Sequence, residues 1–148
     1  MQIIVAPDPF SPGDQLERFS ARADGAGAIV SFSGLVRDEG GRLTRMEIEH
    51  YPGMTERALA AIAQQAVERW ALADALIIHR HGTLQPGEVI MMVATAARHR
   101  RDAFAGAEFL MDYLKSRAPF WKKEFAADGA EWVAAKDADE DALTRWDR

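Results

Sequence analysis

Hydrophobic residues recur along the chain with two different periods, and each period predicts its own kind of element. Between residues 55 and 70 the apolar positions follow the i, i+3, i+4, i+7 spacing of one buried helical face, with Thr55 as the expected N-cap. A second apolar stripe runs from Ala103 to Leu114, and this helix should end before Pro119, because a residue that precedes proline avoids the helical conformation. The predicted helices, the first of them short, cover residues 14–23, 55–70 and 103–118.

Shorter apolar runs, bounded by glycine, proline or charged residues, predict strands. These strands cover residues 2–5, 28–36, 43–51, 75–84, 88–96 and 120–125. Residues 89–94 do not alternate between apolar and polar, so this run is expected at the centre of a sheet, covered on both faces. Pro86 and Gly87 suit the central positions of a type II turn. Strands 28–36 and 43–51 flank a polar, glycine-rich loop and are expected to pair as an antiparallel hairpin.

Strands grouped into hairpins, with helices inserted between them, predict an α+β fold with a mostly antiparallel sheet and two long helices. The length of 148 residues, with 48% hydrophobic and 28% charged positions, suits one domain over residues 1–148, with an acidic tail from about residue 126. The N-terminus carries no basic region, and no apolar run approaches the ~18 residues of a membrane span. A cytoplasmic protein that does not associate with membranes is therefore expected.

The chain contains no cysteine, which excludes disulfides, a thiolate metal site and a sulfur nucleophile. If the protein performs sulfur chemistry, another molecule must bring the sulfur. The histidines are not spaced as a helical pair for zinc, so neither a metal nor a cofactor is expected, although the pair His79 and His81 leaves a metal site open.

Positive charge is concentrated in one part of an acidic chain. Residues 98–123 contain seven cations and three anions, a local net charge of +4, whereas the whole chain carries −5. Such an island indicates a local anion site rather than a track for nucleic acid.

Two lysines near the proline break are the main candidates for chemistry. Lys115 falls at the border of the apolar stripe, where partial desolvation would lower its pKa and make it a base or nucleophile. Alternatively, its amine extends into solvent at the helix end and complements the helix dipole. In the extended segment, Lys122 shares a side with Glu124, whereas Trp121 and Lys123 point the other way. The alternative for Lys122 is a solvated basic strand end.

Residues 98–101 precede the second long helix, where free backbone N–H groups and arginines suit a phosphate. His99 can add a proton or a hydrogen bond there, and the alternative is a charged connecting loop. Arg37, in the glycine-rich loop, is a further candidate cation.

Several runs of sequence resemble one known family, the large, catalytic subunit of molybdopterin synthase (the MoaE family). They are the segments FSGLVR (32–37), EHYPGMT (49–55), IHRHG (78–82), HR (99–100) and MDYLKSRAPFWKKE (111–124). The resemblance covers nearly the whole chain, and the last segment is highly specific. It implies an α/β-hammerhead fold and a homodimer that binds a small ubiquitin-like sulfur-carrier subunit at each end, forming a heterotetramer.

The implied activity is that of a sulfurtransferase. The carrier's C-terminal Gly-Gly thiocarboxylate would donate sulfur twice to cyclic pyranopterin monophosphate, creating the dithiolene of molybdopterin. By resemblance Lys115 and Lys122 are catalytic, with Lys115 as principal base or nucleophile and Lys122 as its electrostatic and proton-transfer partner. The remaining matched residues are implied to bind substrate in a pocket shared between protomers: Arg37, His99, Arg100, Lys123, Glu124 and Lys136. The loop 38–42 is shorter than the family's, which leaves its substrate contacts open.

Two other functions compete with the enzyme. A non-catalytic module that binds a ubiquitin-like carrier tail would retain carrier binding without both lysines and would consume no pterin. A nucleotide- or RNA-binding domain would use the 98–123 cations, but the sequence contains no glycine-rich phosphate loop or base-stacking motif.

Overall fold

The computed structural model describes residues 1–133 and 137–147, and its centre is a four-stranded sheet. The strand order is β1 (Gln2–Ala6), β4 (Asp74–Arg80), β6 (Val89–Ala97) and β2 (Ala28–Leu35). β1 and β4 are parallel, whereas the other two pairs are antiparallel. Strand β6 is therefore central, and its residues from Ile90 to Ala97 are buried, as its continuous apolar run predicted.

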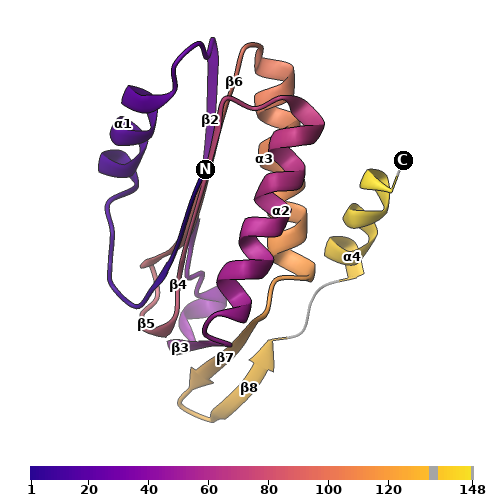
Figure 1. The fold of residues 1–148 in the computed structure, drawn as a ribbon. Coiled ribbons are helices and arrows are strands. Elements are labelled where there is room, and N and C mark those ends of the chain that lie inside the picture. Colours follow the sequence, from indigo (N-terminus) through magenta and orange to yellow (C-terminus); the bar gives the residue numbers. More distant parts are fainter. Residues whose placement is uncertain (134–136, 148) are drawn as a thin grey trace.

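Helices cover both faces of this sheet (Figure 1). α1 (Pro12–Arg22) lies on one face, and α2 (Met54–Trp70) and α3 (Arg100–Ser116) lie side by side on the other. Ser11 caps α1 by accepting a hydrogen bond from the Asp14 N–H. All three helices occur where hydrophobic spacing predicted them.

A second sheet continues from one end of the first (Figure 1). Its order is β5 (Gly82–Leu84), β3 (Leu43–His50), β7 (Phe120–Ala126) and β8 (Gly129–Val133), with every pair antiparallel. The predicted strand 75–84 is divided at His81 between the two sheets. Gly82, with a φ of 91°, occupies the left-handed region just after this division, a conformation that favours glycine.

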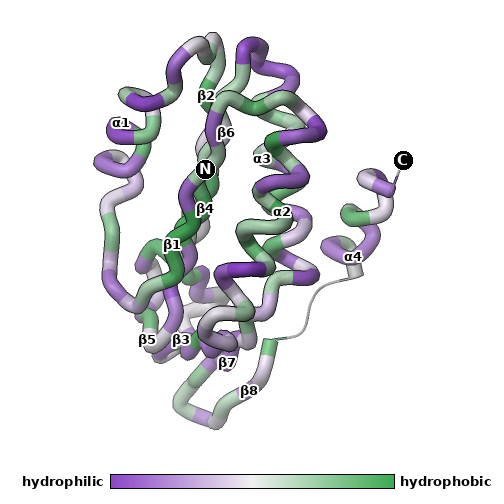
Figure 2. The backbone as a smooth tube through the Cα atoms, in the orientation of Figure 1, coloured by the Kyte–Doolittle hydropathy of each residue, from purple (hydrophilic) through white to green (hydrophobic). Residues whose placement is uncertain are grey.

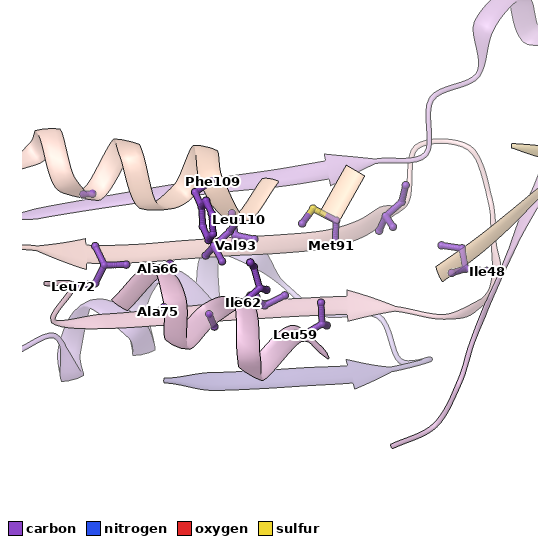
Figure 3. Packing of buried hydrophobic residues seen from close by; sticks show 14 of the residues in the cluster. Ile48, Leu59, Ile62, Ala66, Leu72, Ala75, Met91, Val93, Phe109 and Leu110 are labelled. Atoms are coloured by element: carbon purple, nitrogen blue, oxygen red, sulfur yellow. The ribbon is translucent and has the colours of Figure 1, made fainter. Parts of the chain in front are cut away.

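The main hydrophobic core lies between the first sheet and the pair α2 and α3 (Figure 3). Leu59 and Ile62 of α2 and Leu110 of α3 are buried there against Val93 of β6. Burial of each such side chain contributes about 1.5–3 kcal/mol. Figure 2 shows the matching pattern, in which the central strands are mostly hydrophobic and the helices alternate between hydrophobic and hydrophilic residues.

Two local expectations from the sequence are wrong. Strands 28–36 and 43–51 do not form a hairpin, because β2 pairs with β6 and β3 pairs with β5 and β7. The loop between them contains a short 3₁₀ helix, η1 (Glu39–Gly41), and leads from one sheet into the other. Thr55 is not the N-cap of α2, which is Gly53. The Gly53 N–H donates to the Glu56 carboxylate at 2.6 Å, and the Thr55 hydroxyl donates to the Tyr51 carbonyl within the first turn.

The acidic C-terminal tail contains elements that the sequence did not predict. After β8 come α4 (Asp137–Leu143) and the 3₁₀ helix η2 (Thr144–Trp146). Trp146 packs edge-on against Trp70 and Phe109, and its Nε1–H donates to the Asp112 carboxylate at 2.6 Å. These contacts attach the segment to α2 and α3. Over the described residues, no helix is long and apolar enough to cross a membrane.

Candidate active site

A cavity of about 630 Å³ opens beside the C-terminal end of α3. Its walls come from α3, the loop containing η1, strand β7 and the β7–β8 hairpin. The cations that line it are Arg37, Arg42, Lys115 and Lys122, and the carboxylates are Asp38, Glu124, Asp128 and Glu131. Apolar side chains that include Leu35, Met46 and Ile90 complete the walls. The cavity thus brings four cationic and four anionic side chains together beside an apolar wall.

Lys115 reaches the cavity from the last turn of α3. The helix ends at Ser116, with Arg117 as its C-cap, so the chain turns back toward β7 immediately after this lysine. The Lys115 side chain is exposed. The partial desolvation that the apolar stripe suggested for Lys115 is therefore not found there.

Lys122 enters the same cavity from β7 and is half-buried. Burial first, and then the positive charge of Lys115, lower the pKa of Lys122 to about 8, while the Asp139 carboxylate acts in the opposite direction. An amine with this pKa is partly uncharged near neutral pH and can accept a proton. The two lysines that flank the proline therefore share one cavity.

Strand alternation separates Lys122 from its neighbour Lys123. Lys122, Glu124 and Ala126 line the cavity, whereas Lys123 lies over the rings of Phe125 and Trp132, at 5.4 and 5.2 Å from their centroids. The opposite facing of Lys122 and Lys123 predicted from the sequence is confirmed. Lys123, assigned to substrate by resemblance, does not line the cavity.

Three other candidate residues lie away from the cavity or outside the described chain. His99 is the N-cap of α3 and Arg100 its first residue. At a rise of ~1.5 Å per residue, they lie about 24 Å from Lys115 along the helix. The structure of one chain therefore does not bring His99 and Arg100 together with the lysines. Lys136 lies outside the described residues.

The sequence reasoning missed the part of the cavity that β8 forms. Asp128, Glu131 and Val133 belong to this hairpin, and Arg42 approaches it from the η1 loop, with its Nη2 at 3.4 Å from Asp128 Oδ2. The available signal was the Asp128-Gly129 pair after an alternating run, which is typical of a hairpin turn. Within residues 1–133 and 137–147, no three histidine, aspartate or glutamate side chains are grouped as metal ligands would be.

Similarity to known proteins identifies the family of this chain. Residues 5–117 match the MoaE protein family. A molybdopterin synthase catalytic subunit from Cereibacter sphaeroides is 68% identical over 99% of this chain and 100% of its own length. A solved molybdopterin biosynthesis MoaE protein from Burkholderia ambifaria superposes with a TM-score of 0.85 at 49% identity, covering 99% of this chain and 98% of that one.

The same fold occurs in a solved complex of subunits 1 and 2 of molybdopterin-converting factor from Helicobacter pylori. The likeness has a TM-score of 0.76 at 18% identity and covers 91% of this chain and 90% of that one. The matches at high identity extend over almost the full length of both proteins. The chain therefore belongs to the MoaE protein family.

Proposed function

We propose that this protein is the catalytic subunit of a molybdopterin synthase, a sulfurtransferase that works in the cytoplasm. It transfers sulfur from a thiocarboxylated carrier subunit to cyclic pyranopterin monophosphate and so makes the molybdopterin dithiolene. The observation that carries the proposal is the pair Lys115 and Lys122 in one cavity, with the pKa of Lys122 lowered to about 8. The absence of cysteine fits, because the sulfur arrives with the carrier.

The different burial of the two lysines supports catalytic roles that differ from those suggested by the sequence. With a pKa of about 8, about a quarter of Lys122 amines are uncharged at pH 7.5. Lys122 is therefore the better proton acceptor during sulfur transfer. Lys115 is exposed at the cavity and serves to hold the substrate phosphate.

The small ubiquitin-like carrier is the proposed donor, and its Gly-Gly tail enters the cavity. An extended glycine tail is narrow enough for such an opening, and its terminal thiocarboxylate is attracted by the cationic side chains. Arg37 lines the same cavity and suits the phosphate of the pterin. Glu124 lies on the Lys122 side of β7 and suits the donors of the pterin ring.

A homodimer would complete the site, in a heterotetramer with two carriers. His99 and Arg100 suit a phosphate but lie at the far end of α3 from Lys115, so a second copy is the proposed source of these residues at each cavity. β2 supports a contact between copies, since it is an edge strand with Ile29, Phe32 and Leu35 exposed. Lys136 is the remaining basic residue proposed to come from the neighbouring copy.

The decisive experiment mixes the purified chain with thiocarboxylated carrier and pyranopterin and measures the dithiolene product. Lys115→Ala should abolish conversion while carrier binding, measured by calorimetry, stays nearly unchanged. Lys123→Ala is the matched control, because Lys123 lies on the opposite face of β7, and it should retain turnover. Wild-type turnover by Lys115→Ala would remove this residue from the mechanism. Carrier binding without any pterin consumption by the unmodified chain would favour a non-catalytic binding module.

A further inference from the structure

A buried histidine forms part of the structure beneath Lys122. His79 of β4 is 2% exposed, and its ring stacks on Phe120 of β7 with centroids 3.7 Å apart and planes at 15°. The two rings come from different sheets, so the stack joins the sheets close to Lys122. Phe120 and Lys122 are two residues apart on β7 and therefore share a side of the strand.

The geometry identifies which nitrogen of the His79 ring carries a proton. Its Nδ1 lies 2.7 Å from the Arg80 carbonyl oxygen, which can only accept, so Nδ1 carries the proton. Burial first, and then the positive charge of Lys122, lower the pKa of His79 to about 3. The imidazole is therefore neutral at physiological pH, and it presents a flat, weakly polar surface.

Other ionisable groups face Lys122 from the neighbouring elements. Lys115 of α3 repels the ammonium form, and Asp139 of α4 favours it. Glu124, on the same side of β7, also borders the cavity. His50 lies between Phe120 and His81, with its ring centroid 6.2 Å from that of Phe120 and 4.2 Å from that of His81. Burial lowers the pKa of His81 first, and the charge of His50 lowers it further.

We propose that His79 is a positioning residue that, stacked on Phe120, forms a dry aromatic floor under Lys122 and holds its amine away from water. The hydrogen bond to the Arg80 carbonyl fixes the ring where the chain leaves β4 for β5. A smaller polar side chain at this position would lose the stack on Phe120 and would admit water. The catalytic consequence of the floor rests on the proposed function, whereas the floor itself does not.

The test reads the ionisation of Lys122 directly in the full chain, without substrate. The chain has four lysines, so ¹³C-lysine NMR resolves each titration, and Lys122→Arg assigns the signal of interest. His79→Asn should raise the pKa of Lys122 from about 8 by one unit or more, toward the ordinary value of 10.5. His79→Phe, which keeps a stacked ring, should leave the pKa near 8.

Phe120→Leu provides a second route to the same floor if His79→Asn folds poorly. This change removes the other ring of the stack and should raise the pKa of Lys122 as well. An unchanged titration of Lys122 in both His79→Asn and Phe120→Leu would overturn the proposal. So would an equal rise in His79→Phe, because the ring surface would then be irrelevant.

Turnover separates this inference from the proposed function. A rise of one unit would reduce the uncharged fraction of Lys122 at pH 7.5, and hence kcat, about eightfold, and the acid limb of the kcat profile would move by about one pH unit. KM should change little. If the NMR titration moves but the kcat profile does not, the floor stands and the proton-accepting role of Lys122 in the proposed function is refuted.

Discussion

Replacing Lys122 with methionine should make the protein more stable while it removes activity. In the unfolded chain a lysine holds its proton up to a pKa of 10.5, but in the folded chain Lys122 releases it near pH 8. Protonation therefore favours the unfolded state, and the penalty on folding is complete below pH 8 and disappears as the pH rises toward 10.5. Each unit of pKa corresponds to about 1.4 kcal/mol, so the shift from 10.5 to about 8 corresponds to about 3.5 kcal/mol.

Partial exposure of the Lys122 side chain reduces this figure, and a gain of about 2 kcal/mol in the free energy of unfolding is expected for Lys122→Met at pH 7. Methionine has a similar length and can occupy the apolar part of the site. Urea denaturation followed by tryptophan fluorescence at pH 7 and pH 10 measures the effect. The advantage of the variant over wild type should shrink at pH 10.

Lys123→Met is the matched control. Lys123 contacts Phe125 and Trp132 on the other face of β7, so this change should remove about 0.5–1 kcal/mol of cation–π stabilisation and give no gain. If Lys122→Met were less stable than wild type at pH 7, by an amount independent of pH, Lys122 would not be desolvated. The assignment of this lysine as a proton acceptor would then lose its physical basis.

Three further outcomes follow from the packing. Gly27→Ala should lower the free energy of unfolding, measured by thermal melts, by about 1–3 kcal/mol, because a Cβ atom there would lie 2.5 Å from the Arg98 carbonyl oxygen. An unchanged melting curve would show that the backbone at Gly27 can shift freely. Trp146→Ala removes the hydrogen bond to Asp112 and the contacts of the Trp146 ring. Limited proteolysis should therefore cleave residues 137–147 faster in this variant than in wild type, and equal rates would exclude an anchoring role for Trp146. The His79 ring resists protonation down to about pH 3, whereas an unfolded histidine takes up a proton near pH 6.5. Between pH 8 and pH 5, the free energy of unfolding of wild type should therefore fall by about 2 kcal/mol relative to that of His79→Phe. A difference between the two proteins that stays constant over this range would contradict a buried neutral ring.

Local chemistry made most of the individual elements predictable. The helices follow from spacing, and the type II turn at Pro86 and Gly87 is confirmed by a φ of 87° at Gly87 and by the hydrogen bond from the Glu88 N–H to the Gln85 carbonyl. Strand pairing was not predictable in the same way. β2 and β3 are neighbours in sequence, but β2 pairs with β6, antiparallel, from Ala28 to Leu35. This pairing depends on the burial of apolar side chains from segments that are distant in sequence.

The candidate site was partly predictable for similar reasons. Alternation along an extended segment was sufficient to place Lys122 and Lys123 on opposite faces. Desolvation, in contrast, depends on what packs nearby, and no spacing rule links His79 to Phe120 or places Asp139 near Lys122. The helical wheel identified Lys115 as the shielded amine, but a wheel contains no information on what packs around the helix end, and the side chain is exposed.

The cavity has walls of unequal rigidity, because they belong to different parts of the fold. The ring of His79, close to Lys122, is attached to β4, which is buried along its whole length between β1 and β6. β8, in contrast, is an edge strand with every residue exposed, and it pairs with β7. Amides of β4 should therefore exchange with solvent only when the whole protein unfolds, whereas those of β8 exchange through small local openings. Movement of β8 then admits a ligand, and the alignment of the reacting amine on β7 survives each binding event.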